Sequence, residues 1–398
     1  MMDERLFLEQ LLDIPALKID KVYHERRRIL LHCHSEQDNL VCPRCGSLRD
    51  KTVRRYEERQ VRDLDISGKE VWIYLRVRQF ECECGHYFHE LFEWVAAGKS
   101  YTIRQAKFVF ELCAKQPFSE VGAIVNMHAK TVERLYYDQA KVAINLPQRY
   151  AQVRRLGIDE LSLRKGKGEY CCVLTDLERG IQLDILPNRK KETLIAHFQR
   201  MGSQFGTQIK HVSCDMWRPY TQVAQQCFPQ ATITIDRFHV VAALNEALNT
   251  ERKALRRAEP KQPGFKKLKW LLFKRSEKLN DKQHTALQHA FELAPQLQQT
   301  YEFRNRFHAI LDEADSKPQA SQWLESWIQE VQATQNPVWN KFINILTNWK
   351  DLILNFVESG ISNAVTEGLN NLIRYVKRIS FGIPNFEHMR LRVLANIV

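Results

Sequence analysis

Two pairs of cysteines place the strongest constraint on what this chain can fold into. Cys42 and Cys45 stand in the run CPRCG, and Cys82 and Cys84 stand in the run CECG. Each pair, followed by a glycine, places two thiolates on one side of a tight turn, and two such turns complete a tetrahedral Zn²⁺ site. The sequence therefore predicts a small zinc-binding domain in the first quarter of the chain.

This zinc site is expected to be structural. Its composition leaves no obvious open ligand position, which a catalytic zinc would keep. Because the second pair is more closely spaced than the first, His86 or His89 could replace one sulfur. The alternative is buried thiols without metal, which suits Cys171 and Cys172 better because they lie in an apolar run. The acidic start of the chain is unlike a signal peptide, so we expect reduced cysteines.

The charge of the chain indicates its kind of partner. Its 398 residues include 59 Lys and Arg against 47 Asp and Glu, which gives a formal net charge of +12. A basic surplus of this kind is typical of proteins that bind nucleic acid. No stretch approaches the ~20 uncharged apolar residues that cross a bilayer, so we expect a soluble protein with no membrane partner.

Alternating polar and apolar residues indicate strands around the cysteines. We expect an N-terminal helix over residues 1–20 and a β zinc-ribbon domain over residues 21–98. The run KEVWIYLRVRQF has a period of two residues, which turns one basic and aromatic face outward. Arg76 and Arg78 on this face are predicted to contact DNA.

Residues 99–145 change to helical periodicity and favour a helix-turn-helix. The first helix is expected over about 118–125, and the second begins at Ala129 after a short turn. The second helix would present four side chains to a DNA groove, namely Thr131, Glu133, Arg134 and Tyr137. A plain helical hairpin is the alternative.

From residue 146 onward, short strand-like runs indicate an α/β domain. Three such runs are followed by helix, strand, helix and strand, which predicts a mixed sheet covered by helices. We assign the first part of this domain to residues 146–239 and its second part to residues 351–398. A charged helical insertion over residues 240–350 separates them.

The last long helix, expected over about 362–379, has two kinds of surface. Its apolar residues have the spacing of a buried stripe, formed by Val365, Leu369, Leu372, Ile373 and Val376. The remaining surface carries amides and cations suited to a DNA backbone, among them Asn371, Arg374, Lys377 and Arg378.

Three acidic residues lie where burial should be unfavourable. Asp159 follows the apolar run Leu-Gly-Ile, Asp215 follows the run HVSC, and Glu367 lies beside the stripe of the last helix. Three converging carboxylates repel one another unless cations share the site, so divalent metal is their natural occupant. Taken singly, each acid has a structural alternative as a turn residue, a helix cap or part of a solvated helix face.

Six motifs together resemble bacterial insertion-sequence transposases with a DDE triad, of the ISL-three group. They are CPRCG, CECG, GIDE at 157–160, CDMWRPY at 214–220, DRFHV at 236–240 and SNAVTEGLNNLIRYVKR at 362–378. The resemblance implies a ribonuclease H-like catalytic core, with Asp159, Asp215 and Glu367 as ligands of two Mg²⁺ (or Mn²⁺) ions per active site. Asp236 and His239 match an auxiliary Asp-x-x-His element of related transposases, or else serve as a helix cap and a packing histidine.

A second basic region lies in the helical insertion. Residues 252–278 carry eleven cations against two acids, with aromatic residues between them, which is too one-sided for ordinary salt-bridge patterning. We expect an arm that contacts phosphates and whose binding falls steeply with salt. Its predicted DNA contacts are Arg256, Arg257, Lys266, Lys267 and Lys269.

The sequence therefore predicts a DNA transposase that binds the terminal inverted repeats of an insertion sequence, cuts the ends and transfers them to target DNA. Because two ends must be joined, a homodimer or larger synaptic complex is expected, in the bacterial cytoplasm and associated with the nucleoid. Two alternatives stay open: a two-metal nuclease without strand transfer, and a sequence-specific DNA-binding regulator of transposase descent. No motif specifies the terminal repeat, the target preference, or cut-and-paste against replicative transposition.

Overall fold

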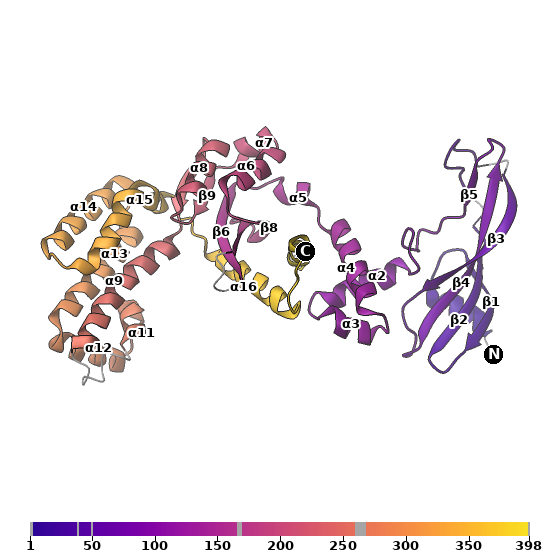
Figure 1. Cartoon of the computed structure of the whole chain (residues 1–398), viewed down its shortest axis with the longest axis horizontal. Coiled ribbons are helices and arrows are strands. Elements are labelled where there is room, and N and C mark those ends of the chain that lie inside the picture. Colours follow the sequence, from indigo (N-terminus) through magenta and orange to yellow (C-terminus); the bar gives the residue numbers. More distant parts are fainter. Residues whose placement is uncertain (1–2, 38–39, 49–50, 165–168, 259–267, 397–398) are drawn as a thin grey trace. The chain divides into compact units, whose positions relative to one another are not determined.

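The computed structural model describes residues 3–37, 40–48, 51–164, 169–258 and 268–396. These residues form two compact units (Figure 1). The first unit contains the residues up to 144 together with 376–396, and the second contains residues 145–375. The chain therefore returns to the first unit near its C-terminus, and helix α16 (Ala364–Ile379) carries it across the boundary.

Five strands form the sheet of the first unit. They are β1 (Leu17–His24), β2 (Arg28–Ser35), β3 (Lys51–Arg62), β4 (Glu70–Cys82) and β5 (Tyr87–His89), in the order β1-β2-β4-β3 with β5 paired to β4. β2 and β4 are parallel, and the other neighbours are antiparallel. Ile73 and Leu75 of β4 are fully buried, and each such side chain stabilises the fold by about 1.5–3 kcal/mol.

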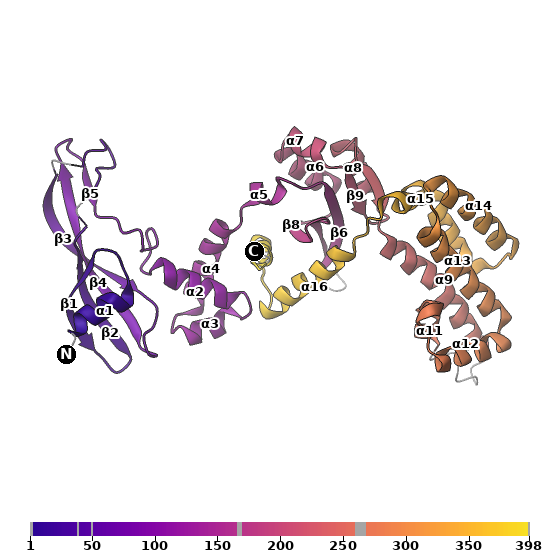
Figure 2. The same cartoon turned by 180° about the vertical axis from the view of Figure 1, so that it is seen from behind.

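The N-terminal helix is shorter than expected and belongs to this sheet. α1 spans Glu4–Leu12, and Leu8 and Leu12 pack into the same core as the strands (Figure 2). Asp13 ends the helix because its φ angle is +47°, which a helix does not continue. The last residues of the expected helix over 1–20 therefore lie in β1.

Four helices form a second core in the first unit. They are α2 (Ile103–Cys113), α3 (Phe118–Ile124), α4 (Ala129–Ala143) and α17 (Phe386–Ala395). The turn between α3 and α4 passes close to α3, because a Cβ on Gly122 would lie 2.6 Å from the carbonyl oxygen of Met127. Two helices with a tight turn therefore occupy the positions at which the sequence predicted them.

The C-terminal helix belongs to the first unit, which differs from the expected assignment of residues 351–398 to the α/β domain. Arg392 of α17 is buried and donates hydrogen bonds to the carbonyl oxygens of Cys113 (3.3 Å) and Gln116 (2.8 Å). Its guanidinium carbon also lies 4.2 Å from the ring centroid of Phe118. These contacts fix α17 to α2 and α3.

Five strands form the mixed sheet of the second unit. They are β6 (Arg155–Arg164), β7 (Glu169–Asp176), β8 (Ile181–Leu186), β9 (His211–Cys214) and β10 (Thr232–Ile235), in the order β10-β9-β6-β7-β8. β10, β9 and β6 are parallel to one another, whereas β7 and β8 are antiparallel to their neighbours. The helices before and between them are α5 (Leu146–Tyr150), α6 (Lys191–Arg200), α7 (Ser203–Gln208) and α8 (Arg218–Cys227).

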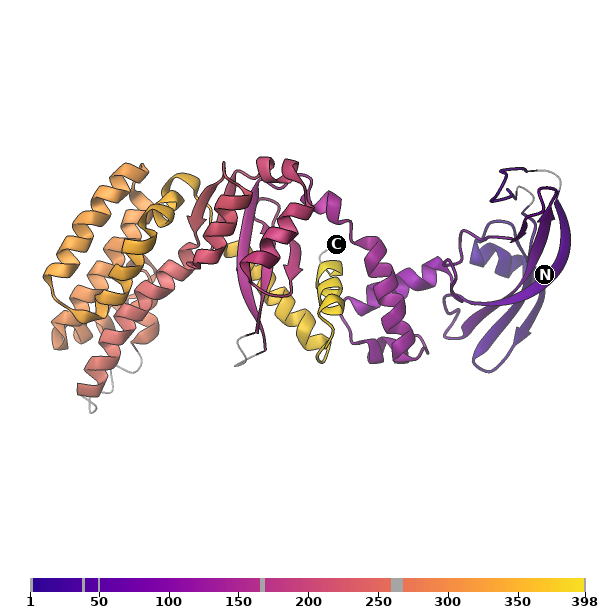
Figure 3. The same ribbon diagram turned by 45° about the horizontal axis from the view of Figure 1, so that its top comes forward.

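After β10 the described chain is helical up to α16 (Figure 3, salmon to orange). The elements are α9 (Arg237–Ala258), α11 (Lys269–Phe273), η1 (Ser276–Lys278), α12 (Asp281–Leu293), α13 (Pro295–Glu313), α14 (Lys317–Ala333), η2 (Pro337–Trp339) and α15 (Asn340–Ser359). An aromatic cluster joins α13, α14, η2 and α15, and in it the buried Trp327 donates its indole N–H to the carbonyl oxygen of Phe303 at 2.9 Å. A second hydrophobic cluster packs α9, α11 and α12 with the start of α13. α15 returns to the sheet, where Asn355 donates to the carbonyl oxygen of Ile233 at 2.7 Å.

Helix α16 packs unusually close to β6. A Cβ on Gly157 would lie 2.8 Å from Leu177, 3.0 Å from the Thr366 hydroxyl and 3.2 Å from the Asn363 side-chain oxygen. Glycine is therefore required where the helix crosses the strand. At this crossing, polar side chains near the start of α16 lie against the sheet.

Candidate active site and metal centres

The four paired cysteines come together in the first unit. One Sγ atom from each of Cys42, Cys45, Cys82 and Cys84 lies within 4.8 Å of the other three. The Sγ–Sγ distances are 3.8 Å for Cys42 to Cys84 and 3.6 Å for Cys45 to Cys82. Four sulfurs around a zinc ion with Zn–S bonds of about 2.3 Å lie roughly 3.8 Å apart, so the cluster has the size that Zn²⁺ requires.

The backbone around the cysteines favours thiolates. Gly46 and Gly85 follow the two pairs with φ angles of +73° and +76°, and their N–H groups donate to the carbonyl oxygens of Cys42 (2.9 Å) and Cys82 (2.8 Å). Desolvation opposes ionisation of Cys42, but hydrogen bonds from backbone N–H groups and neighbouring thiols outweigh it and lower the Cys42 pKa to about 6. Against a hydrogen bond from the Cys84 backbone N–H, burial and the neighbouring cysteines raise the pKa of Cys82 to about 12, and they also raise that of Cys84, so without metal the four sulfurs do not all ionise together. Thiolates are the form that binds zinc.

Neither nearby histidine belongs to this cluster. His86 stacks on Phe88 with ring centroids 6.3 Å apart, and Nε2 of His89 lies 3.4 Å from a Glu57 carboxylate oxygen. The structure thus gathers four sulfurs without a nitrogen.

Three parallel strands of the second unit carry an aspartate where their parallel pairing stops. Asp215 and Asp236 come directly after β9 and β10, whereas Asp159 lies within β6, one residue beyond the stretch that pairs with β9. Ile158 of β6 lies opposite Cys214 of β9, and Cys214 lies opposite Ile235 of β10. Asp159, Asp215 and Asp236 are the next residues along the three strands. Because neighbouring strands lie about 4.8 Å apart, this register places three acidic residues side by side at one edge of the parallel strands.

Asp159 and Asp215 form the centre of this group. A carboxylate oxygen from each and a ring nitrogen of His239 all lie within 4.8 Å of one another. His239 Nε2 is 2.9 Å from Asp215 Oδ1, and this contact, opposed by burial, raises the His239 pKa to about 9. Asn370 of α16 donates from Nδ2 to Asp159 Oδ2 at 2.6 Å.

Burial and like charge both act on Asp159. Burial is the larger cause and the carboxylate of Asp215 the second, and together they raise the Asp159 pKa to about 6. A positive charge between Asp159 and Asp215 would stabilise the ionised form of Asp159. The oxygen donors and their burial therefore fit a divalent cation such as Mg²⁺.

Glu367 lies outside this group, which differs from the expectation that three carboxylates converge. Its side chain is exposed and lines a cavity of about 360 Å³ together with Asp236, Phe238 and His308. The physical reason is the orientation of α16. Thr366 faces the sheet, and its neighbour Glu367 is turned about one-third of a helical turn away.

Asp236 is buried and bound to two backbone groups. Its Oδ1 accepts the N–H of Phe238 at 3.3 Å in the first turn of α9 and the N–H of Asn363 at 3.2 Å before α16. Burial raises its pKa. Asp236 therefore connects the end of β10 to the starts of two helices.

The buried stripe predicted for the last helix is present only in part. Ile373 and Val376 are fully buried and Leu369 and Leu372 are half-buried, but toward the start of the helix polar residues take the buried face. Asn363, Thr366 and Asn370 are buried, whereas Val365 is 39% exposed. Side-chain atoms of all three polar residues lack a hydrogen-bond partner among the described residues. We call Asn363, Thr366 and Asn370 the polar seam. The spacing of three and four residues between these positions is typical of a buried helix face. Because the residues are polar, the sequence did not indicate that this face is buried.

The predicted DNA contacts of the first unit differ in their exposure and in their partners within the protein. Arg76 is exposed and stacks on Tyr56 with its guanidinium carbon 3.9 Å from the ring centroid. Arg78 is instead paired with the buried Glu90 at 2.8 Å. On α4, Arg134 is exposed and Thr131 half-buried.

Tyr137 does not face a groove as expected. It is buried in the helical core and stacks on His388, with ring centroids 4.0 Å apart. Glu133 is half-buried, and one of its carboxylate oxygens lies 3.6 Å from His388 Nδ1.

The predicted contacts of the basic arm are only partly described. Arg256 and Arg257 are exposed at the end of α9, and Lys269 is half-buried with Nζ 4.8 Å from the Trp270 ring centroid. Lys266 and Lys267 lie outside the described residues.

On α16, three of the four predicted contacts are exposed. They are Asn371, Arg374 and Arg378, whereas Lys377 is half-buried. Nη1 of Arg374 donates to Oδ1 of Asn371 at 2.7 Å, so these two polar side chains lie together on the exposed face.

Comparison with known proteins identifies the class to which this fold and these sites belong. Residues 156–393 match a family model described as a transposase, the DDE transposase of ISL3 type. Residues 38–85 match the zinc-finger of transposases IS204, IS1001, IS1096 and IS1165. The chain belongs to the ISL3 (ISL-three) family of DDE transposases, which are enzymes acting on DNA, and this confirms the family predicted from its motifs.

Two curated relatives extend along most of the chain. The transposase for insertion sequence element IS1001 of Bordetella parapertussis is 26% identical over 363 residues, which cover 89% of this chain and 88% of the relative. The transposase for insertion sequence element IS1557 of Mycobacterium tuberculosis is 27% identical over 370 residues, which cover 86% and 82%. Among the described residues, every helix is too short or too polar to cross a bilayer.

Proposed function

We propose that this transposase binds the terminal inverted repeats of an insertion sequence, cleaves the DNA at the element ends and joins the freed ends to target DNA. The register of β6 and β9, which sets Asp159 beside Asp215, is the observation that carries the proposal. Paired carboxylates at the point where two parallel strands stop pairing are suited to bind cations next to a phosphodiester.

Asp159 and Asp215 would hold two Mg²⁺ or Mn²⁺ ions, with Glu367 as a third ligand. When bound, such ions activate an attacking oxygen and stabilise the leaving oxygen of a phosphodiester. Glu367 stands on α16 between Asn363 and Asn370, the residues that attach this helix to Asp236 and Asp159. The proposal therefore requires Glu367, which lines the cavity beside Asp236, to move toward Asp159 and Asp215 when the ions bind.

The other residues of the site would act by positioning. His239 orients Asp215 through its Nε2 contact, and Asp236 fixes the first turn of α9. Asn370 holds the Asp159 carboxylate in one orientation. These contacts fix the two carboxylates before DNA arrives, which lowers the cost of assembling the reactive geometry.

We further propose that the mixed sheet is a ribonuclease H-like core and that α3 and α4 form a helix-turn-helix. The strand order β10-β9-β6-β7-β8 supports the first assignment, and the tight turn at Gly122 supports the second. The zinc domain and α4 would read the element ends through Arg76, Thr131 and Arg134. Arg256, Arg257, Lys269 and the exposed cations of α16 would bind phosphates. Two chains would be needed to hold two ends.

Incubation of the purified protein with pre-cut element ends, Mg²⁺ and a supercoiled target tests this function. Covalent joining of ends to the target is expected. Hydrolysed ends without joined products would favour a nuclease, and binding of the ends without cleavage or joining would favour a regulator. Asp159→Asn should still bind the ends and lose both reactions, because it retains the shape of the side chain without its charge.

A further inference from the structure

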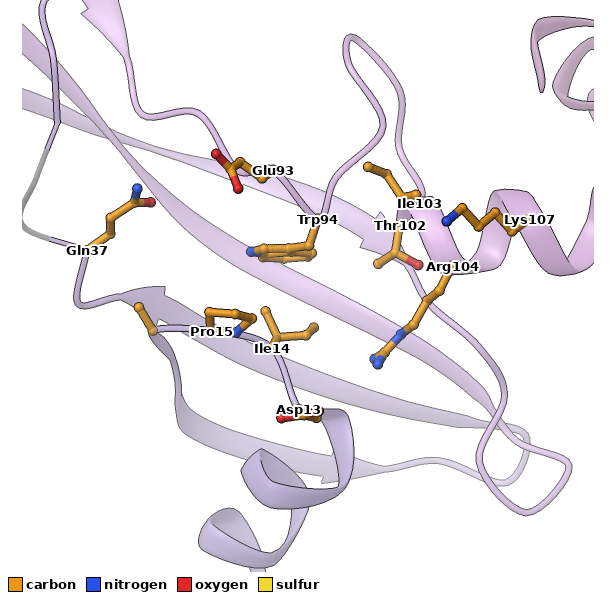
Figure 4. Close-up of a pocket in the computed structure, with 11 residues that line it drawn as sticks. Asp13, Ile14, Pro15, Gln37, Glu93, Trp94, Thr102, Ile103, Arg104 and Lys107 are labelled. Carbon is orange, nitrogen blue, oxygen red and sulfur yellow. The ribbon is translucent and has the colours of Figure 1, made fainter. Parts of the chain in front are cut away.

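A cavity in the first unit lies apart from both metal centres. Its volume is about 570 Å³, within the roughly 300–1,000 Å³ typical of small-molecule sites. It lies between the turn after α1 and the start of α2 (Figure 4). Trp94 stands in its middle, with Ile14 and Pro15 facing one side of the indole ring. The space beside the ring is thus bordered by flat, apolar surface.

Four of the polar groups around this cavity are unused by the protein. Within the described part of the chain, the side chains of Gln37, Glu93 and Lys107 form no hydrogen bond or ion pair, and the Trp94 indole N–H has no acceptor. Arg104 differs, because it is bound to Asp63 at 2.8 Å and to the Leu12 carbonyl oxygen at 2.5 Å. Its fixed guanidinium forms a wall of the cavity.

These groups define the chemistry of a ligand. An aromatic ring favours a flat, conjugated partner that stacks on it. The amide of Gln37 both donates and accepts, the Glu93 carboxylate only accepts, and the Lys107 ammonium attracts an anion. A purely apolar ligand would leave all three without partners. A flat ring with N–H donors, attached to a phosphate, would satisfy each of them.

We propose that this cavity binds one unstacked nucleobase of DNA, with its ring on Trp94, its polar edge toward Gln37 and Glu93, and its phosphate near Lys107. Because Glu93 accepts hydrogen bonds, bases with an exocyclic amino group, such as cytosine and adenine, fit better than thymine. The proposal rests on the DNA-binding function proposed above. A free nucleotide offers the same chemistry and is the second source of such a base.

Binding to duplexes with one unpaired base tests the proposal. The fluorescence anisotropy of a labelled duplex carrying a single unpaired cytosine is compared with that of the same duplex fully paired, in the full-length protein. We expect the unpaired cytosine to tighten binding about tenfold, and Trp94→Ala to abolish this gain. Trp323→Ala on α14, at an exposed tryptophan outside the cavity, should keep the gain.

A second variant guards against loss of folding, because Trp94 is half-buried against the sheet core. Glu93 is exposed, so Glu93→Gln should leave the melting temperature and zinc content unchanged. It should make binding of unpaired cytosine and unpaired thymine nearly equal. If Glu93→Gln keeps the full preference for cytosine, the proposed orientation of the base is overturned.

The remaining outcomes distinguish a DNA base from a free nucleotide, and the cavity proposal from the proposed catalytic function. Quenching of Trp94 fluorescence by deoxycytidine monophosphate, without a gain from the unpaired base, would assign the cavity to free nucleotides. If the wild-type protein shows neither the gain from the unpaired base nor the quenching, the proposal is overturned. Asp159→Asn should retain the gain from the unpaired base, so failure of catalysis and failure of this cavity are observed separately.

Discussion

At the scale of single residues, the site depends on contacts that fix two carboxylates close together. Asp159 is held by Asn370 at 2.6 Å, and Asp215 is held by His239 at 2.9 Å. Neither aspartate is paired with Lys or Arg at these contacts. The charge of the pair is therefore only partly balanced within the protein, which leaves it suited to bind cations.

Replacing Asn370 tests this positioning. Asn370→Ala removes the hydrogen bond to Asp159 and should destabilise the protein by about 1–3 kcal/mol, since it leaves Oδ2 of this carboxylate without its donor, while Oδ1 keeps the Glu160 N–H. Cleavage should fall while DNA affinity stays the same. Denaturant unfolding and cleavage of labelled ends measure the two effects.

The neighbouring Asn371 supplies a stability control for that variant. It has the same side chain on the same helix but is exposed, so Asn371→Ala should change the unfolding free energy by less than about 0.5 kcal/mol. Equal stability losses at both positions would contradict the role assigned to the Asn370 contact.

At the scale of elements, the close crossing of α16 over β6 decides where the polar seam lies. Gly157→Val should destabilise the protein by about 1–3 kcal/mol and reduce cleavage, because the added side chain meets Leu177 and Thr366. Gly368 of α16 has open space around its Cβ position. Gly368→Ala should instead stabilise the helix by about 0.5–1 kcal/mol. Thermal unfolding of both variants shows whether stability depends on the close packing at Gly157 or on the loss of any glycine.

The cysteine cluster makes a separate prediction for the zinc domain. Cys82→Ser should reduce bound zinc from one ion per chain to nearly none and destabilise the first unit, because metal binding is coupled to folding. Cys227 is a half-buried thiol of α8 outside the cluster, and Cys227→Ser should keep the full zinc content. Elemental analysis measures both. Retention of zinc by Cys82→Ser would reject the four-sulfur site.

The elements also show what sequence periodicity can and cannot predict. The alternation in β4 correctly places Ile73 and Leu75 inside, and the sequence places α3 within a residue of its observed bounds and the start of α4 at Ala129. Asp159 within β6 and Asp215 after β9 are visible in the sequence as acids that end apolar runs. Their shared register depends on strand pairing, which a single sequence does not contain.

Hydrophobic periodicity does not predict a buried helix face that is formed by polar residues. The apolar stripe expected on α16 is correct at Ile373 and Val376, which are fully buried. In the first half of the helix, Asn363, Thr366 and Asn370 occupy the buried face instead. Likewise, α17 packs on α2 and α3 through the buried Arg392, whose cationic side chain gives no sign of a core position. In both cases tertiary contacts outweigh local pattern.

At the scale of the whole molecule, the net charge of +12 predicts DNA affinity that falls with salt. Replacing Arg374 and Arg378 of α16 by alanine should reduce the slope of log affinity against log salt by about 1.8, which is roughly 0.9 for each lost phosphate contact. Binding of labelled ends at several KCl concentrations gives the slope.

A matched double variant controls for the change in net charge. Arg306 and Lys350 are ion-paired to Glu330 and Glu325, so their replacement by alanine removes two positive charges away from the predicted contacts. The salt slope should stay at the wild-type value. A slope that falls equally in both double variants would assign DNA binding to overall charge rather than to α16.

Metal-specific rescue of cysteine variants tests the central claim most directly. In Asp159→Cys and Asp215→Cys, a thiolate replaces the proposed carboxylate ligand, and thiolates bind Mn²⁺ better than Mg²⁺. We predict that both variants fail to cleave element ends with Mg²⁺ and recover cleavage with Mn²⁺. Undiminished cleavage with Mg²⁺ in either variant would contradict the assignment of these two aspartates as the metal ligands.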